Sequence, residues 1–114
     1  MLVGISDKIL HKWLEGKEYM NCSNEGEAVA ICAGYFYATG KIGTAFMSAD
    51  GFMNALNFIT SWIIPSLIPI NIVISIGRTE DPHVVATKIT EPIINLLNEI
   101  HYGSKAITFE FVRK

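Results

Sequence analysis

The chain has 114 residues, half of them apolar, and a formal net charge of −2 at pH 7. This length predicts a single domain, and the near-neutral balance argues against nucleic-acid binding, which requires a clustered basic face. Its two cysteines, Cys22 and Cys32, are too few for a disulfide framework and lack the spacing of a zinc site. We therefore expect neither a metal site nor a disulfide scaffold.

No segment has the pattern of a membrane span or a secretory signal. The most apolar segment, residues 62–77, is too short to cross a bilayer and is interrupted by Pro65 and Pro69. The first residues lack the basic region and long apolar stretch of a signal peptide. The sequence therefore predicts a cytoplasmic protein that makes no membrane contact.

The first elements are two short strands around a short helix. Residues 2–5 and 18–22 are predicted strands. Ser6 is expected to cap the helix between them, and Gly16 to end it. The residues that share its apolar face are Ile9, Leu10, Trp13 and Leu14.

A longer helix follows, capped by Ser23 and Asn24 and ended by Gly40. Glu27 stands three residues after Asn24, as in a capping box. Residues 28–38 are apolar on every side, so this helix must be covered on more than the face that meets the sheet. In so small a domain we expect the second cover to come from another subunit.

Strand and helix patterns continue to alternate in the second half. Strands are predicted at residues 42–47, 70–76 and 106–112. A turn at Gly51 is expected to lead into a helix whose apolar residues lie within 52–59.

The last helix is expected to follow a loop at residues 78–88, with Thr90 as its cap and Glu91 and Pro92 in its first turn. Its apolar stripe should comprise Ile93, Ile94, Leu97 and Ile100. The alternation predicts an α/β fold, a three-layer sandwich with a parallel sheet of about five strands and helices on both faces. Ligands of such folds bind beyond the carboxyl ends of the strands.

Several segments resemble phosphonopyruvate and sulfopyruvate decarboxylases. The stretch NEGEAVAICAGY, continuing to ATGK at residue 41, resembles their N-E-G-x-A-x-A-x-A-A-G-Y…A-T-G-K/R segment. Residues 47–61 are similar to M-Q-N-S-G-L-G-N-A-V-N-P-L-T-S, and residues 68–78 look like I-P…L-L-I-G-W-R. Residues 3–7 match V-G-V-P-D more loosely, so the resemblance covers nearly the whole chain.

The resemblance implies a thiamine-diphosphate-binding fold of the pyrimidine-binding (PYR) type, spanning residues 1–114 without the first helix usual in the family. Such a chain is the α-subunit of a 2-oxo-acid decarboxylase, a carboxy-lyase, and supplies half of an active site. A diphosphate-binding subunit with a G-D-G…N-N motif, which this sequence lacks, would hold Mg²⁺ and the diphosphate of the shared coenzyme. A dimer or hetero-oligomer is therefore expected.

On this resemblance, Glu25 is both catalytic and coenzyme-binding: its carboxyl would hydrogen-bond N1′ of the aminopyrimidine. Asn24, Gly51 and Asn54 match neighbouring coenzyme-binding positions, although the amide of Asn54 also suits the organisation of a loop or a subunit contact. From the residues alone, the favoured interpretation of Glu25 is a solvated acid at a helix N-terminus.

Asp7 and His83 are the other catalytic candidates implied by the resemblance, as proton relays near the substrate. Asp7 also suits the first turn of a helix, and His83 suits a solvated loop. Arg78 is a candidate for the substrate's anionic group, or for a carboxylate at a subunit boundary.

The segment Ser48, Ala49 and Asp50 replaces the family's Q-N-S in the substrate pocket. The negative charge of Asp50 disfavours a phosphonate or a sulfonate there. Two alternatives stay open: a non-catalytic regulatory or assembly relative of this domain, and a flavodoxin-like domain with an unrelated ligand.

Overall fold

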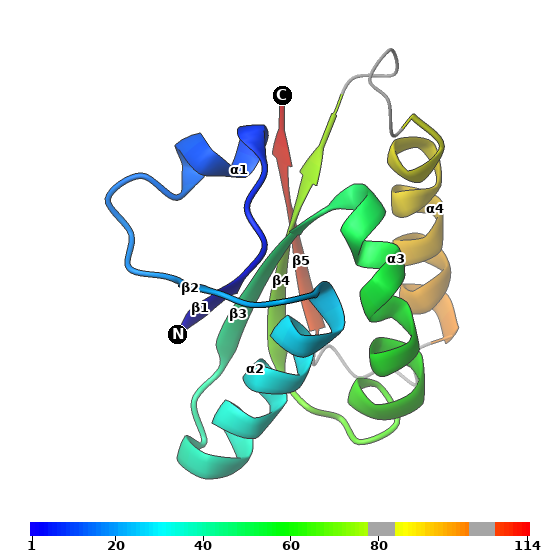
Figure 1. Ribbon diagram of the computed structural model, residues 1–114. Coiled ribbons are helices and arrows are strands. Elements are labelled where there is room, and N and C mark those ends of the chain that lie inside the picture. The colour runs from blue at the N-terminus through cyan, green and yellow to red at the C-terminus, as the bar shows by residue number, and fades with distance from the viewer. Residues whose placement is uncertain (78–83, 101–106) are drawn as a thin grey trace.

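The computed structural model describes residues 1–77, 84–100 and 107–114, which form one five-stranded, all-parallel sheet (Figure 1). The strands lie in the order β2-β1-β3-β4-β5, and their bounds are β1 Leu2–Gly4, β2 Met20–Asn21, β3 Gly43–Ser48, β4 Ile70–Ile76 and β5 Ile107–Arg113. The predicted α/β class and parallel sheet are confirmed. Strand β2 lies on one side of β1, and the later strands β3, β4 and β5 lie on its other side. The position between β1 and β3 is therefore the switch point of the strand order, where ligands of doubly wound sheets bind.

Helices lie on both faces of this sheet, but unequally (Figure 1). Their bounds are α1 Lys8–Trp13, α2 Glu25–Thr39, α3 Ala49–Phe58 with its π-helical continuation η1 Ile59–Ile63, and α4 Val84–Ile100. Helices α2, α3 and α4 form one layer, which we call the helix face. The short α1 packs on the opposite side, the second face.

Each face has its own apolar cluster. On the helix face, Ile72 and Ile74 of β4 pack with Phe52 of α3 and Val29 of α2, all fully buried. Burying one such side chain contributes about 1.5–3 kcal/mol. The second cluster is confined to one end of the sheet, where the buried residues are Leu10, Leu14, Phe46 and Val73.

Helix α2 has the predicted ends. The Asn24 side chain accepts a hydrogen bond from the Glu27 N–H at 2.9 Å, and Gly40 ends the helix at a positive φ of 73°. Asparagine caps and left-handed glycines satisfy backbone groups that a helix leaves unpaired at its ends.

The predicted starts of α1 and α3 were wrong by one or two residues. Asp7, not Ser6, caps α1, because its carboxylate accepts the Leu10 N–H at 2.8 Å. Gly51 is not in a turn before α3: Ser48 caps that helix by accepting the Gly51 N–H, so Gly51 lies in its first turn.

The predicted start of α4 was wrong by a larger margin. Residues 84–88 are helical rather than loop, and Thr90 is a buried interior residue whose hydroxyl donates to the Ala86 carbonyl at 2.6 Å. Pro92 lies within the helix, where it removes one backbone hydrogen bond. Packing of Ile94 and Leu97 against the core outweighs that cost.

The helices in the described part of the chain include none that is both long and apolar enough to cross a membrane.

Candidate functional site

The helix face contains a buried carboxylate, that of Glu25, the first residue of α2, which is 8% exposed. Asn54 of α3 donates its side-chain N–H to Glu25 Oε1 at 3.0 Å. Gly51 leaves room for the other oxygen, because a Cβ at position 51 would lie 2.4 Å from Oε2. Three of the predicted coenzyme-binding residues are therefore in direct contact.

A second glycine completes the contact between α2 and α3. A Cβ added to Gly26 would lie 2.6 Å from Cε2 of Phe58. Gly51, Asn54 and Phe58 are three and four residues apart, so they lie along one side of α3 and face the start of α2. The position of the carboxylate thus depends on close packing between two helices.

Glu27, in the same helical turn, has a different environment. Its carboxylate is exposed and accepts the Ser23 N–H and hydroxyl, both at 2.9 Å. These hydrogen bonds hold the pKa of Glu27 below its ordinary value. Asn24 acts as the cap of α2, and its side-chain oxygen bonds Glu27 rather than facing Glu25. A first-turn acid with an ordinary capping role therefore lies beside Glu25 for comparison.

The other candidates gather at the carboxyl ends of β1, β3 and β4. A pocket of about 420 Å³ opens there, lined by Asp7, Lys8, Ile9, Ser48, Ala49, Asp50, Ser75, Gly77, Thr87 and Lys114. It contains one predicted catalytic residue, Asp7, and three predicted substrate residues. It lies at the β1/β3 switch point, as expected for a ligand site in this class of sheet.

Both carboxylate oxygens of Asp7 accept a hydrogen bond. Its Oδ1 accepts the Leu10 N–H, and its Oδ2 accepts the hydroxyl of Ser75 at 2.5 Å. Ser75 is buried in β4 and was not predicted as a site residue. The sequence did contain a signal for this residue: Ser75 and Asn71 are the two polar residues in a strand whose other residues are isoleucine and valine. Thr87 also lines the pocket and was not predicted as a site residue, because the sequence analysis placed it in a loop rather than in α4.

The first turn of α3 joins the two groups. Asp50 lines the pocket, while the next residue, Gly51, contacts Glu25. Arg78 and His83 lie outside the described residues. The structure therefore places the predicted residues that it describes, apart from the helix cap Asn24, in two adjacent clusters, one around Glu25 and one around Asp7.

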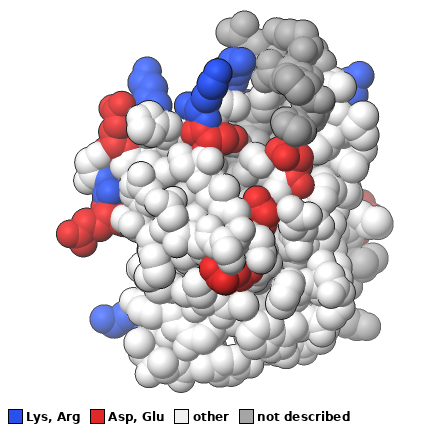
Figure 2. Space-filling view, viewed as in Figure 1, with Lys and Arg blue, Asp and Glu red and all other residues white. Residues whose placement is uncertain are grey.

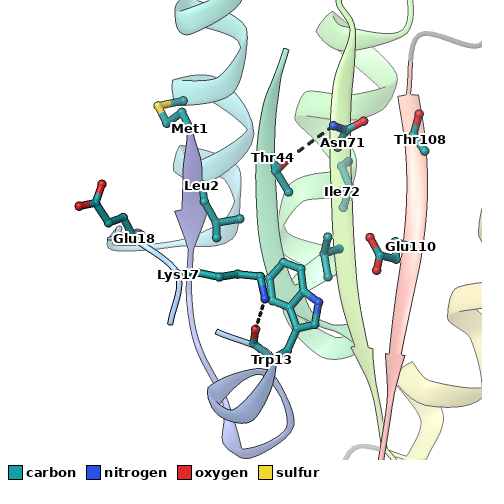
Figure 3. A pocket seen from close by; sticks show the side chains of 11 residues that line it. Met1, Leu2, Trp13, Lys17, Glu18, Thr44, Asn71, Ile72, Thr108 and Glu110 are labelled. Atoms are coloured by element: carbon teal, nitrogen blue, oxygen red, sulfur yellow. Dashed lines mark hydrogen bonds between the residues drawn. The ribbon is translucent and has the colours of Figure 1, made fainter. Parts of the chain in front are cut away.

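A trough of about 640 Å³ lies on the second face, away from these residues (Figure 3). Its floor is a cross-strand row of polar side chains, Thr44, Asn71 and Thr108, which are paired in register. Trp13 lies against the sheet beside this row, and Lys17 donates to the Trp13 carbonyl. The trough exists because α1 covers only the other end of this face.

The helix face is poor in charge. Figure 2 shows that Lys and Arg side chains lie at the upper and left margins of this view, that a few Asp and Glu side chains lie across its middle, and that its lower part is largely uncharged. Helices α2, α3 and α4 expose large apolar side chains, namely Tyr37, Phe58, Val85, Ile89 and Leu96. Tyr37, at 62% exposure, belongs to the helix for which the sequence predicted a second cover.

Comparison with known proteins adds no family: no protein-family model matches the chain, and no curated protein matches it significantly. In the described ranges, no group of three or more His, Cys, Asp or Glu side chains could hold a metal ion.

Proposed function

We propose that this chain is the PYR subunit of a thiamine-diphosphate-dependent 2-oxo-acid decarboxylase, active with a separate diphosphate-binding subunit. The observation that carries the proposal is the burial of Glu25. A helix-capping acid is expected to be solvated, as Glu27 is, whereas Glu25 is 8% exposed and held by Asn54. A buried, oriented carboxyl is what recognition of an aminopyrimidine nitrogen requires.

The residues fit the pyrimidine end of this coenzyme. Glu25 Oε1 accepts the side-chain N–H of Asn54, and the carboxyl, when protonated, can donate a hydrogen bond to a ring nitrogen, which carries no hydrogen of its own. The absence of a Cβ at Gly51 makes the room that this carboxyl occupies. When bound, the coenzyme would supply the electron sink that decarboxylation of a 2-oxo acid needs.

Each residue of this cluster then has a defined role. Glu25 would hold a proton between its carboxyl and N1′ of the aminopyrimidine, and Asn54 would fix the orientation of that carboxyl. The helix packing around Gly51 would keep water away from it. The chain has no G-D-G…N-N motif, so the diphosphate and Mg²⁺ would be held by the partner.

The adjacent pocket would take the substrate. Ser48 offers a hydroxyl, and Lys8 offers a cation, for the carboxylate of a small 2-oxo acid. Asp7 and Asp50 both line this pocket, and their carboxylates disfavour a second anionic group on the substrate. We therefore propose a 2-oxo acid with an uncharged or cationic distal group.

The helix face would receive the partner subunit. It is largely uncharged, it exposes apolar side chains from three helices, and it contains Glu25 at the start of α2. Apolar surface of this kind is typical of protein interfaces. A partner seated there would lie next to the Glu25 carboxylate, which a shared coenzyme requires.

The alternative, a non-catalytic relative that retains the fold for regulation or assembly, is favoured by one observation. Both oxygens of Asp7 are engaged, one by the cap of α1 and one by Ser75, which is a complete structural role.

The decisive experiment is a native pull-down of the full chain with a decarboxylation assay on the purified complex. A partner with G-D-G…N-N, and CO₂ release from a 2-oxo acid that requires thiamine diphosphate and Mg²⁺, would support the proposal.

Glu25→Gln should keep the complex and lose at least about 100-fold in turnover, since proton transfer by a positioned group contributes on that scale. Glu27→Gln, in the same helical turn, is the matched control and should retain turnover. A chain that purifies alone, with no coenzyme-dependent activity, would refute the proposal.

A further inference from the structure

Strand β5 forms one edge of the sheet in the described part of the chain. It pairs with β4 in unbroken register from Ile70↔Ile107 to Ile76↔Arg113, and no described residue pairs with its other side. Proteins commonly protect such edges with proline, a bulge, a very short strand or charged side chains. The sequence ITFEFVR contains no proline and its register shows no bulge, and its charged residues are one acid, Glu110, and one base, Arg113.

The backbone groups on the open side can be identified. Lys114 donates its N–H to the Ile76 carbonyl at 3.1 Å, so the backbone of Lys114 faces β4. Backbone direction alternates along a strand paired in this way. The N–H and C=O groups of Phe109, Phe111 and Arg113 therefore point away from β4.

The apolar side chains of β5 are also incompletely covered. Ile107, Phe109 and Phe111 face the helix layer, where the rings of Phe109 and Phe52 meet edge to face at 6.0 Å. All three nevertheless stay only half-buried, whereas the equivalent residues of β4 are buried. Within the described part of the chain, the outward side of this edge thus has no backbone partner, and its apolar side chains are only partly covered.

We propose that β5 pairs antiparallel with β5 of a second copy of this chain, about a two-fold axis at Phe111. Such an arrangement closes as a symmetric dimer and continues the sheet across the two copies. It goes beyond the proposed function, since it requires neither coenzyme nor a diphosphate-binding partner.

Charge selects this register over its neighbour. With Phe111 on the axis, Glu110 lies opposite Val112 of the second copy and diagonal to both Lys114 and Glu110 of that copy, so the two Glu110 carboxylates are only diagonal neighbours and each has a lysine on its other diagonal. Arg113 lies opposite Phe109 of the second copy. A two-fold axis at Glu110 would instead place two carboxylates directly opposite each other, which is destabilising.

The first test is sedimentation equilibrium of the full chain over a roughly hundredfold concentration range, since dimer formation follows mass action. Arg113→Pro removes an N–H that points outward, so it leaves the pairing with β4 intact. We expect this variant to dimerise at least about tenfold more weakly than Arg113→Ala, which loses the same side chain but keeps the N–H. Monomers at every concentration, or equal dimerisation of the two variants, would overturn the proposal.

A second test fixes the register and applies even if Arg113→Pro fails to fold. Glu110 and Val112 of opposite copies would form a non-hydrogen-bonded pair with Cα atoms about 4.5 Å apart, within disulfide range. Copies carrying Glu110→Cys and copies carrying Val112→Cys, each with Cys22→Ser, are mixed under mild oxidation. The mixture should cross-link at least about tenfold faster than either variant alone, because of this proximity. Equal rates would contradict the register and the interface.

Discussion

The two faces of the sheet are packed in different ways, although the same strands form both. In β4, Ile72 and Ile74 face the helices and are buried in a continuous core. Their neighbours on the second face are Asn71, Val73 and Ser75, of which Val73 lies under α1 and Asn71 lies in the open trough. The contrast shows that a strand whose sequence is almost wholly apolar can still present polar side chains on one face. Here two polar residues four positions apart, Asn71 and Ser75, mark that face.

The largest loss of stability is expected from a substitution at Gly4, where the second face is as tightly packed as the helix face. A Cβ at Gly4 would lie 1.9 Å from the carbonyl oxygen of Phe46, a backbone atom that cannot move without separating β1 from β3. Gly4→Ala should therefore lower the free energy of unfolding by more than about 4 kcal/mol, measured by urea denaturation.

Gly34→Ala is the control for this glycine, since a Cβ there meets no atom within 4 Å. It should raise the free energy of unfolding by up to about 1 kcal/mol, because alanine is the better helix former. Similar losses in both variants would show that the contact between Gly4 and Phe46 is not the cause.

Adjacent residues of β4 allow a direct comparison of the two faces. Ile72→Ala should cost about 3 kcal/mol of unfolding free energy, because it leaves a cavity in the helix-face core. Asn71→Ala should cost less than about 1 kcal/mol, since the hydrogen bond from its side chain to Thr44 is long at 3.5 Å. Comparable losses in urea denaturation would mean that the trough is as well packed as the core.

The dryness of the helix face can be tested by pH. Burial raises the pKa of the Cys32 thiol to about 12, whereas its ordinary value is 9.0. Above pH 9 the unfolded chain loses this proton and the folded chain keeps it, so stability falls as pH rises from 9 towards 12. The expected loss at pH 10 is about 1 kcal/mol.

Cys32→Ala is the matched variant, because it cannot titrate at this position. The difference in unfolding free energy between wild type and variant should shrink between pH 8 and pH 10 by about that 1 kcal/mol. A difference that is constant with pH would indicate that water reaches this thiol.

The smallest effect concerns the rim of the helix face. Hydrogen bonds from Ser23 lower the pKa of the exposed Glu27 carboxyl from its model-peptide value of 4.5. Their stabilisation is present above pH 4.5 and is lost as pH falls through the lower folded value. Glu27→Gln should therefore lower the thermal midpoint slightly at pH 7, and the difference should vanish in acid. A difference that persists at low pH would contradict this assignment.

The sequence predicted the sheet well because strand signals are local. The apolar runs, Asn24 before α2 and Gly40 after it all act within a few residues. The start of α4 was not predicted, because Pro92 carries a strong local signal for a helix start, whereas the packing of Thr90 and Ile94 that keeps the helix continuous is tertiary.

The candidate site shows the same limit. Glu25, Gly51 and Asn54 were selected by resemblance, but their mutual contact depends on how α2 crosses α3, which no local pattern specifies. The hydrogen bond between Ser75 and Asp7 joins residues 68 positions apart. Sequence periodicity could place Ser75 on a face of β4 but could not identify its partner.

The space beside Gly51 has a consequence for how sequences of this kind can change over evolution. A side chain at position 51 would overlap the Glu25 carboxylate, and a side chain at position 26 would overlap the Phe58 ring. Positions 25 and 51 are thus constrained as a pair, as are positions 26 and 58. In homologous chains, a larger residue at position 51 should be accompanied by a shorter residue at position 25. Position 51 should therefore vary mainly in the homologues whose position 25 is no longer glutamate.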